Sequence, residues 1–335
     1  MRYVESLNQA LHDLIASDDR VYLIGQDVLD PYGGAFKVAK GLSTRFPDRV
    51  ITTPVSEAAM VGLGTGLALR GFRPIVELMF GDFVLLAADQ IVNSAAKFPM
   101  MFNGQVTVPL VIRVPMGARR GYGPTHSQTI ETFFLNTPGL DIVAPSHVHD
   151  PGRILRTVVE RSGGVTLFVE NKSLYATELL SADDPESMWH VRLVPEATGY
   201  ETAHVTLNGV DEADVVLIAY GGMAPIALEA AYQAFMEDEV AVACLFPSQI
   251  KPLPWQTILD VVAATPRLLV AEESVEYAGW GAELTARLST SRRRVDVTRV
   301  GAREFVIPSA KELESQVVPG PRDLVRAIRQ LTDAG

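Results

Sequence analysis

The chain has 335 residues, of which 47% are hydrophobic, and its 29 basic and 40 acidic side chains give a formal net charge of −11. This acidic excess argues against a general binder of nucleic acids or acidic membranes. The single cysteine, Cys244, excludes an intrachain disulfide and a zinc site built from cysteines. No segment approaches the roughly 18 uninterrupted apolar residues of a membrane span, and the start lacks a signal-peptide pattern. We therefore expect a cytoplasmic protein that binds neither membrane nor nucleic acid.

Strands and helices are predicted to alternate along the first half of the chain. After a helical start, apolar and β-branched runs occupy 20–28, 49–55, 73–80, 108–115 and 165–172. Helical stretches separate several of these runs, which is the pattern of a parallel α/β sheet. Ligands of such sheets bind beyond the carboxyl ends of the strands.

A second alternation of strands and helices begins at Asp214. The predicted strands are 214–221, 240–247, 267–274 and 294–301, and the predicted helices are 224–235, 255–264, 281–289 and 321–331. The acidic, proline-containing stretch before them shows no clear periodicity and is predicted to be a linker. The fold class is therefore two doubly wound α/β domains, at 1–180 and 208–335, joined by a linker at 181–207.

The stretch from Thr53 to Gln90 holds the first candidate functional residue. Ser56 stands at the N-cap position of a helix predicted over 57–69, and Glu57 opens that helix. The helix dipole favours the ionised carboxylate, whereas burial beside Val55, Met60 and Val61 would oppose it. Such a carboxylate can exchange protons, although a plain first-turn residue in water is the alternative.

Small residues recur every four positions on one face of this helix. Ala58, Gly62 and Gly66 remove side-chain bulk there, so another backbone is expected to approach this face closely. The glycines do not fit the G-x-G-x-x-G spacing, and they lie inside the helix instead of in the turn before it. This excludes the dinucleotide-binding fingerprint.

A further helix is predicted at 83–97, and a glycine-rich loop follows the strand that ends at Pro115. That loop holds His126, and a helix is expected to begin near Ser127. An imidazole at the ligand edge of a sheet suits proton or substrate handling, but a structural histidine is the alternative. Arg119 and Arg120 fit either a binding site or a solvated turn.

His147 and His149 have the spacing of a metal-binding pair. The sequence offers no third ligand beside them, so no metal site is predicted in this chain.

Several long motifs resemble one known family over nearly the whole chain. They are TPVSEAAMVGLGTGLALRGFRP from Thr53, DFVLLAADQIVNSAAK from Asp82, RVPMGARRGYGPTHSQTIE from Arg113, PGLDIVAPS from Pro138, GWGAEL from Gly279 and RVGA from Arg299. The chain resembles the β subunits of thiamine-diphosphate-dependent 2-oxo acid dehydrogenase E1 components, of pyruvate, branched-chain or acetoin type. The resemblance implies the pyrimidine-binding domain and the C-terminal domain of the transketolase superfamily.

The resemblance also implies roles for individual residues. The family glutamate that hydrogen-bonds the aminopyrimidine ring of thiamine diphosphate falls on Glu57. The aromatic ring that stacks on the pyrimidine falls on Phe83, with Met79 lining the same pocket. The active-site histidine falls on His126. These are the predicted catalytic residues (Glu57, His126) and cofactor-binding residues (Glu57, Met79, Phe83).

The cofactor's diphosphate and Mg²⁺ are held in this family by a partner α subunit, through a Gly-Asp-Gly motif followed by an asparagine. The present sequence has no such pair. The resemblance therefore implies an α2β2 heterotetramer that decarboxylates a 2-oxo acid and passes the acyl group to a lipoyl-bearing E2. Such an enzyme would be active only with its α subunit.

Two alternatives remain open from the sequence. A two-subunit carboligase, or acyloin synthase, would use the same cofactor but hand the carbanion to a carbonyl acceptor. A non-catalytic scaffold subunit is a different class, and the joint presence of Glu57, Phe83 and His126 argues against it. The 2-oxo acid itself and a potassium site are not predicted.

Overall fold

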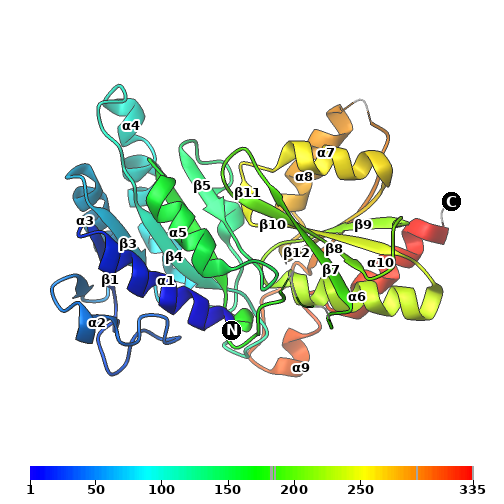
Figure 1. Ribbon diagram of the computed structural model, residues 1–335, viewed down its shortest axis with the longest axis horizontal. Helices are drawn as coiled ribbons and strands as arrows, with labels where there is room; N and C mark the ends of the chain where they lie inside the picture. The colour runs from blue at the N-terminus through cyan, green and yellow to red at the C-terminus, as the bar shows by residue number, and fades with distance from the viewer. Residues whose placement is uncertain (182–183, 185, 292, 334–335) are drawn as a thin grey trace. The chain divides into compact units, whose positions relative to one another are not determined.

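The computed structural model describes residues 1–181, 184, 186–291 and 293–333, and the chain divides into two compact units (Figure 1). The first unit comprises Met1–Met116, Phe133–Val143 and Asp150–Leu179. The second comprises Gly117–Thr132, Ala144–His149 and Leu180–Gly335. The loop that carries His126 is thus grouped with the second unit.

A parallel sheet with the strand order β5-β6-β4-β3-β1-β2 forms the first unit. Its strands are β1 (Val21–Gly25), β2 (Val50–Thr52), β3 (Arg73–Glu77), β4 (Val111–Met116), β5 (Leu140–Val143) and β6 (Val165–Asn171). The five apolar runs of the first half of the sequence all contain one of these strands. Only β5 was not predicted.

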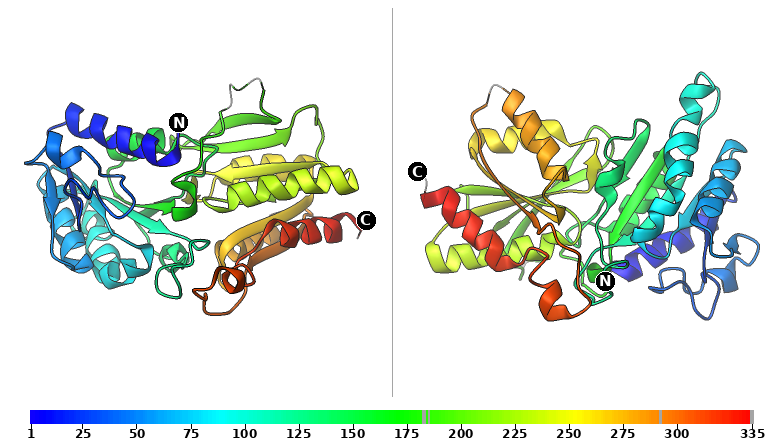
Figure 2. Two further views of the ribbon diagram at one scale, coloured as in Figure 1. Left: turned by 90° about the horizontal axis from the view of Figure 1, so that it is seen from below. Right: turned by 180° about the vertical axis from the view of Figure 1, so that it is seen from behind.

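Helices cover both faces of this sheet. They are α1 (Tyr3–Ser17), α2 (Leu42–Arg45), α3 (Glu57–Leu69) and α5 (Pro151–Arg161). Figure 2 shows α1 and α5 on one face, where they pack together, and α3 on the other. The first unit is therefore doubly wound, as the sequence predicts, and α3 has the predicted bounds.

The stretch predicted as one helix at 83–97 is helical but irregular. It forms a 3₁₀ helix, η1 (Gly81–Ala87), then a π-helix, η2 (Gln90–Ala95), before the short α4 (Phe98–Met101). A Cβ on Gly81 would lie 2.2 Å from Met116 Cγ, so η1 starts with its backbone pressed against β4. Such irregular turns are frequent at functional sites.

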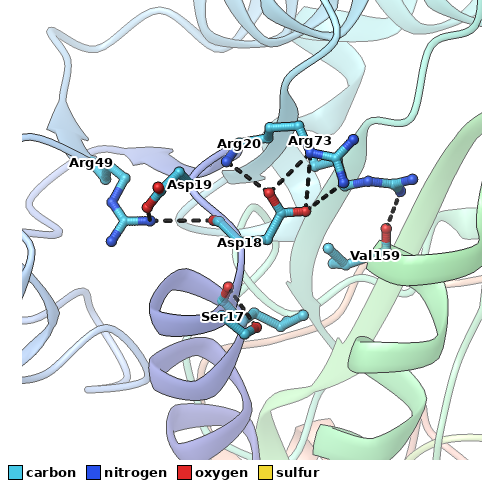
Figure 3. Close-up of polar contacts among 8 residues, drawn as sticks. Ser17, Asp18, Asp19, Arg20, Arg49, Arg73 and Val159 are labelled. Atoms are coloured by element: carbon cyan, nitrogen blue, oxygen red, sulfur yellow. Dashed lines mark hydrogen bonds and ion pairs between the residues drawn. The ribbon is translucent and has the colours of Figure 1, made fainter.

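Arginines tie the C-terminal end of α1 to its surroundings in the first unit (Figure 3). Arg20 Nη2 donates to Asp18 Oδ2 over 2.7 Å, and this bond lowers the pKa of the Asp18 carboxyl. Arg49 Nη1 donates to the Asp18 carbonyl over 3.2 Å and pairs with Asp19 over 3.3 Å. Arg73 donates to the carbonyl of Val159 near the end of α5. The bonds from Arg49 to Asp18 and from Arg73 to Val159 satisfy carbonyl groups that helix ends leave open.

The second unit contains a mixed sheet with the order β13-β12-β9-β10-β8-β7. Its strands are β7 (Trp189–Pro195), β8 (Glu201–Leu207), β9 (Val215–Ile218), β10 (Val242–Pro247), β12 (Arg267–Val275) and β13 (Asp296–Ala302). The short β11 (Gln249–Lys251) follows β10. The antiparallel strands β7 and β8 lie within 181–207, where no regular element was predicted.

The helices of the second unit match the predicted ones and add a short turn. They are α6 (Met223–Asp238), α7 (Trp255–Ala264), α8 (Trp280–Thr290), α9 (Lys311–Glu314) and α10 (Pro321–Asp333). Helices α6 and α10 pack together, and their alanine and leucine side chains join the buried faces of β9, β10 and β12 in one core. Cys244 lies in that core, where burial raises the pKa of its thiol.

Short 3₁₀ turns complete the elements, η3 (Glu131–Phe134) and η4 (Lys172–Leu174). The helix predicted to begin near Ser127 does not form, and η3 is the first helical turn after His126. Across the described part of the chain, no helix combines the length and apolar character needed to cross a bilayer.

Candidate active site

Glu57 lies at the first position of α3, after a strand that ends at Thr52. Ser56 caps the helix, because its hydroxyl accepts a hydrogen bond from the backbone N–H of Ala59 over 3.4 Å. The Glu57 side chain is only 4% exposed, and Met60 and Val61 are buried beside it on the helix. The alternative that Glu57 is a water-exposed carboxylate in the first helical turn is therefore wrong. Val55 is 82% exposed and does not cover it, contrary to expectation.

The small residues of α3 divide between two faces. A Cβ on Gly64 would lie 2.8 Å from Val76 Cγ2 and 2.9 Å from a Leu110 methyl, so Gly64 is where the sheet approaches the helix. Gly66 has no atom of the described chain within 4 Å of an added Cβ, and at Gly62 the nearest is the side chain of Gln90 at 3.4 Å. Of this face, Gly66 is exposed and Ala58 and Gly62 are partly buried, so the first unit covers it only in part.

Met79 follows β3, and Phe83 lies in η1, the irregular helix that packs against α3. Both side chains are partly buried. The Phe83 ring is oriented edge-on to Phe80, with centroids 6.4 Å apart, and the Phe83 N–H donates to the Phe80 carbonyl over 3.1 Å. This packing fixes an aromatic ring at the carboxyl end of the sheet. Glu57, Met79 and Phe83 are therefore gathered in the first unit, on elements in contact.

Beneath this edge, charged residues on β3, β4 and β6 form a buried network that the sequence analysis missed. Arg113 donates from Nε and Nη2 to Glu170 over 2.6 and 2.8 Å, and from Nη1 to Glu77. The Tyr175 hydroxyl donates to Glu170 over 2.7 Å. Burial by itself would lower the pKa of Arg113, but the two carboxylates raise it above its usual value. The guanidinium therefore stays charged and cross-links the ends of three strands.

His126 lies in the loop 117–132, which the structure places in the second unit. The imidazole is partly buried, and its Nδ1 is 2.9 Å from the Thr125 hydroxyl. Positive φ angles at Arg119, Gly121 and Gly123 bend the backbone before it. The four predicted site residues thus fall in two separate units, three in the first and His126 in the second.

The two arginines of this loop differ in their surroundings. Arg119 is not a solvated turn residue, because its Nη2 donates to the carbonyl of Pro319 over 2.6 Å and its Nε lies 3.8 Å from Glu273. The Arg120 guanidinium is 5.9 Å from the ring centroid of Tyr122. Arg119 therefore anchors the loop.

His147 and His149 have structural surroundings. The Nδ1 of His149 is 3.1 Å from the Ser146 N–H, and its Nε2 is 3.1 Å from the carbonyl oxygen of Phe246. Burial and the neighbouring His149 lower the pKa of His147 to about 4, so His147 is neutral at physiological pH. No group of three or more potential ligands around them, or elsewhere in the described residues, is arranged to hold a metal ion.

Buried carboxylates of the second unit were also missed by the sequence analysis. Glu131 is fully buried and accepts a hydrogen bond from the Tyr220 hydroxyl. Burial raises its pKa to about 7, the hydrogen bond from Tyr220 opposes this, and the nearby Glu272 and Glu273 add to it. The only sequence signal was the pair Glu272 and Glu273 inside a run that otherwise has the composition of a buried strand.

Two family models match the chain. The transketolase pyrimidine-binding domain matches residues 1–178, and the transketolase C-terminal domain matches residues 206–324. The β-1 subunit of the mitochondrial pyruvate dehydrogenase E1 component from Oryza sativa subsp. japonica is 34% identical over 331 residues, with 97% of this chain and 85% of that protein covered. The chain belongs to the family of 2-oxo acid dehydrogenase E1 β subunits.

Other E1 β subunits and solved structures agree. The pyruvate dehydrogenase E1 β subunit of Rickettsia conorii is 33% identical, with 98% of this chain and 97% of that protein covered. A split-gene transketolase, described as an inactive β4 tetramer, shares the fold with a TM-score of 0.76 at 20% identity, and 99% of each chain is covered. The Leishmania mexicana transketolase has a TM-score of 0.68 at 17% identity, covering 99% of this chain and 45% of that one. The predicted fold class is confirmed.

Proposed function

We propose that this E1 β subunit works with an α subunit in the thiamine-diphosphate-dependent decarboxylation of a 2-oxo acid. The buried carboxylate of Glu57, at the capped N-terminus of α3, is the observation that carries the proposal. The E1 β subunits at 32–34% identity are named for pyruvate dehydrogenase, so pyruvate is the first substrate to test. Transfer of the acyl group to a lipoyl-bearing E2 is part of the same proposal.

The residues of the first unit fit the pyrimidine end of thiamine diphosphate. None of the described residues donates a hydrogen bond to the Glu57 carboxylate, so its oxygens remain available to a ring nitrogen. Phe83 offers a fixed aromatic ring and Met79 an adaptable apolar wall. When bound, the cofactor would supply the carbanion that 2-oxo acid decarboxylation requires. Glu57 would hold or release a proton at the pyrimidine, and Phe83 would orient the ring.

The partly uncovered face of α3 supports the presence of a partner subunit. Gly62 and Gly66 present backbone without side chains, and such a face permits close approach of another chain. We propose that an α subunit packs there, contributes the diphosphate and Mg²⁺ site, and completes an α2β2 tetramer. The domain limits of 1–180, 181–207 and 208–335 and a cytoplasmic location also stay predictions.

Reconstitution tests this proposal. The chain should be co-expressed with an E1 α subunit, and pyruvate, branched-chain 2-oxo acids and acetoin should be screened with thiamine diphosphate and Mg²⁺. Decarboxylation with an artificial electron acceptor, and lipoamide-dependent turnover, are the expected results. Formation of acyloin with no lipoamide turnover would instead indicate a carboligase. Absence of every activity from a stable α–β complex would overturn the proposal.

A further inference from the structure

Glu273 on β12 binds the loop 117–132 on both sides of His126. The backbone N–H of Ala118 donates to Glu273 Oε1 over 2.6 Å, and the Thr129 hydroxyl lies 3.4 Å from the same oxygen. On the other carboxylate oxygen, Arg119 Nε lies at 3.8 Å. The Glu273 side chain is 3% exposed, so these contacts are shielded from water. One carboxylate therefore links the segment before His126 to the segment after it.

Other contacts limit the freedom of the same loop. The Gly117 N–H donates to the Gln128 carbonyl over 3.1 Å, and this bond joins the two ends of the loop. The Gly121 N–H donates to Glu314 Oε2 over 3.1 Å. A Cβ on Gly123 would lie 2.5 Å from Ser309 Oγ, so the backbone at Gly123 packs directly against Ser309. These contacts fix the loop from Gly117 to Gly123, close to His126 in the sequence.

We propose that Glu273 is a positioning residue for His126: it fixes the ends of the loop and so sets where the imidazole stands. This inference rests on the proposed function, in which His126 handles the substrate or the acyl group. Hydrogen bonds to an ionised carboxylate are about twice as strong as neutral ones, and a displacement of about 1 Å in an active site can cost roughly 10²-fold in rate. A buried carboxylate holding two sides of one loop can supply that precision.

The adjacent Glu272 provides a matched control. It is buried to a similar degree on the same strand, but its oxygens accept from Ser274, the Gly281 N–H and Arg299. None of these partners belongs to the loop. Substitution of Glu272 therefore removes a buried carboxylate from β12 while leaving the contacts of Ala118 and Thr129 in place.

The first experiment measures the loop directly, on the full chain without a partner. Amide hydrogen exchange of Ala118 should accelerate about tenfold or more in Glu273→Ala, because its hydrogen bond is lost. Glu273→Gln should accelerate it less, since the amide oxygen still accepts from Ala118. Glu272→Ala should leave it near the wild-type rate. Unchanged Ala118 exchange in Glu273→Ala, or equal acceleration in Glu272→Ala, would overturn the inference.

The second experiment uses the assembled enzyme and a double-mutant cycle. Glu273→Ala should reduce turnover by roughly 10²-fold, and the same substitution in a His126→Ala background should cause no further loss. Additive losses would show that Glu273 acts independently of His126 and would overturn the inference. Full turnover of His126→Ala would overturn both the site assignment and the inference. If Glu273→Ala fails to fold, Glu273→Gln carries the same cycle with a smaller expected loss.

Discussion

At the residue scale, the position of Glu57 predicts a separation of fold from activity. Glu57→Gln conserves side-chain volume and leaves the Ser56 cap in place, so the chain should remain folded. The amide cannot exchange the proton that the carboxylate can, and a positioned acid or base is worth roughly 10²- to 10⁴-fold in rate. We expect reconstituted decarboxylation to fall by that factor, with an unchanged circular dichroism spectrum. Retention of most of the activity would exclude Glu57 from the chemistry.

Arg113 predicts the opposite result, a loss of fold. Arg113→Ala leaves Glu77 and Glu170 buried without their counter-ion, and an uncompensated buried charge costs about 3–5 kcal/mol. The denaturant midpoint of the chain should fall accordingly. The exposed pair of Arg20 and Asp18 provides a control, because solvent screens it: Arg20→Met should unfold close to the wild-type midpoint. Equal midpoints for the two variants would contradict a structural role for the Arg113 network.

At the element scale, the turn η3, in which the His126 loop ends, predicts a pH dependence of stability. Burial raises the pKa of Glu131 from its ordinary 4.5 to about 7. The folded chain therefore binds this proton more tightly than the unfolded chain, and the contribution of Glu131 to stability decreases as pH rises from 4.5 to 7. The groups that surround it are the Tyr220 hydroxyl and the carboxylates of Glu272 and Glu273, which pair with Arg299 and Arg119.

Glu131→Gln tests this dependence. Its amide oxygen can still accept from the Tyr220 hydroxyl, but the side chain no longer titrates. The free energy of unfolding of the wild type should lose about 3 kcal/mol more than that of Glu131→Gln between pH 4.5 and pH 7. Urea unfolding at several pH values measures the free energy of unfolding of both proteins. Parallel pH profiles would show that Glu131 is ionised in the folded chain.

At the scale of the whole molecule, the proposed division of the site between two subunits predicts what the isolated chain cannot do. The described residues offer no carboxylate or His cluster for a metal ion, and a diphosphate is normally bound through Mg²⁺. We expect no thiamine diphosphate binding to the lone chain by calorimetry, and binding after addition of an α subunit. Tight Mg²⁺-dependent binding without a partner would contradict the heteromeric proposal.

The sequence by itself determined the parts of the fold that depend on neighbouring residues. Ser56 and the β-branched run before it place the start of α3, so the bounds of this helix were predictable. The burial of Glu57 was left open by the sequence and comes from the structure. The strands of the first unit have apolar runs because a parallel sheet is covered on both faces. The family resemblance followed from the same local motifs.

Tertiary structure alone decided the features that depend on distant residues. Strand β7 is partly exposed at the edge of its sheet, and β8 is mostly buried between β7 and β10, pairing antiparallel with both, so the burial of these two strands depends on the strands beside them. The helix predicted at 83–97 is instead a 3₁₀ helix followed by a π-helix, and Gly81 at its start packs against Met116 of β4. Glu273 holds Ala118 across 155 residues of sequence. The sequence does not reveal which group a carboxylate within an apolar strand will bind, because that group lies far away along the chain and only folding brings the two together.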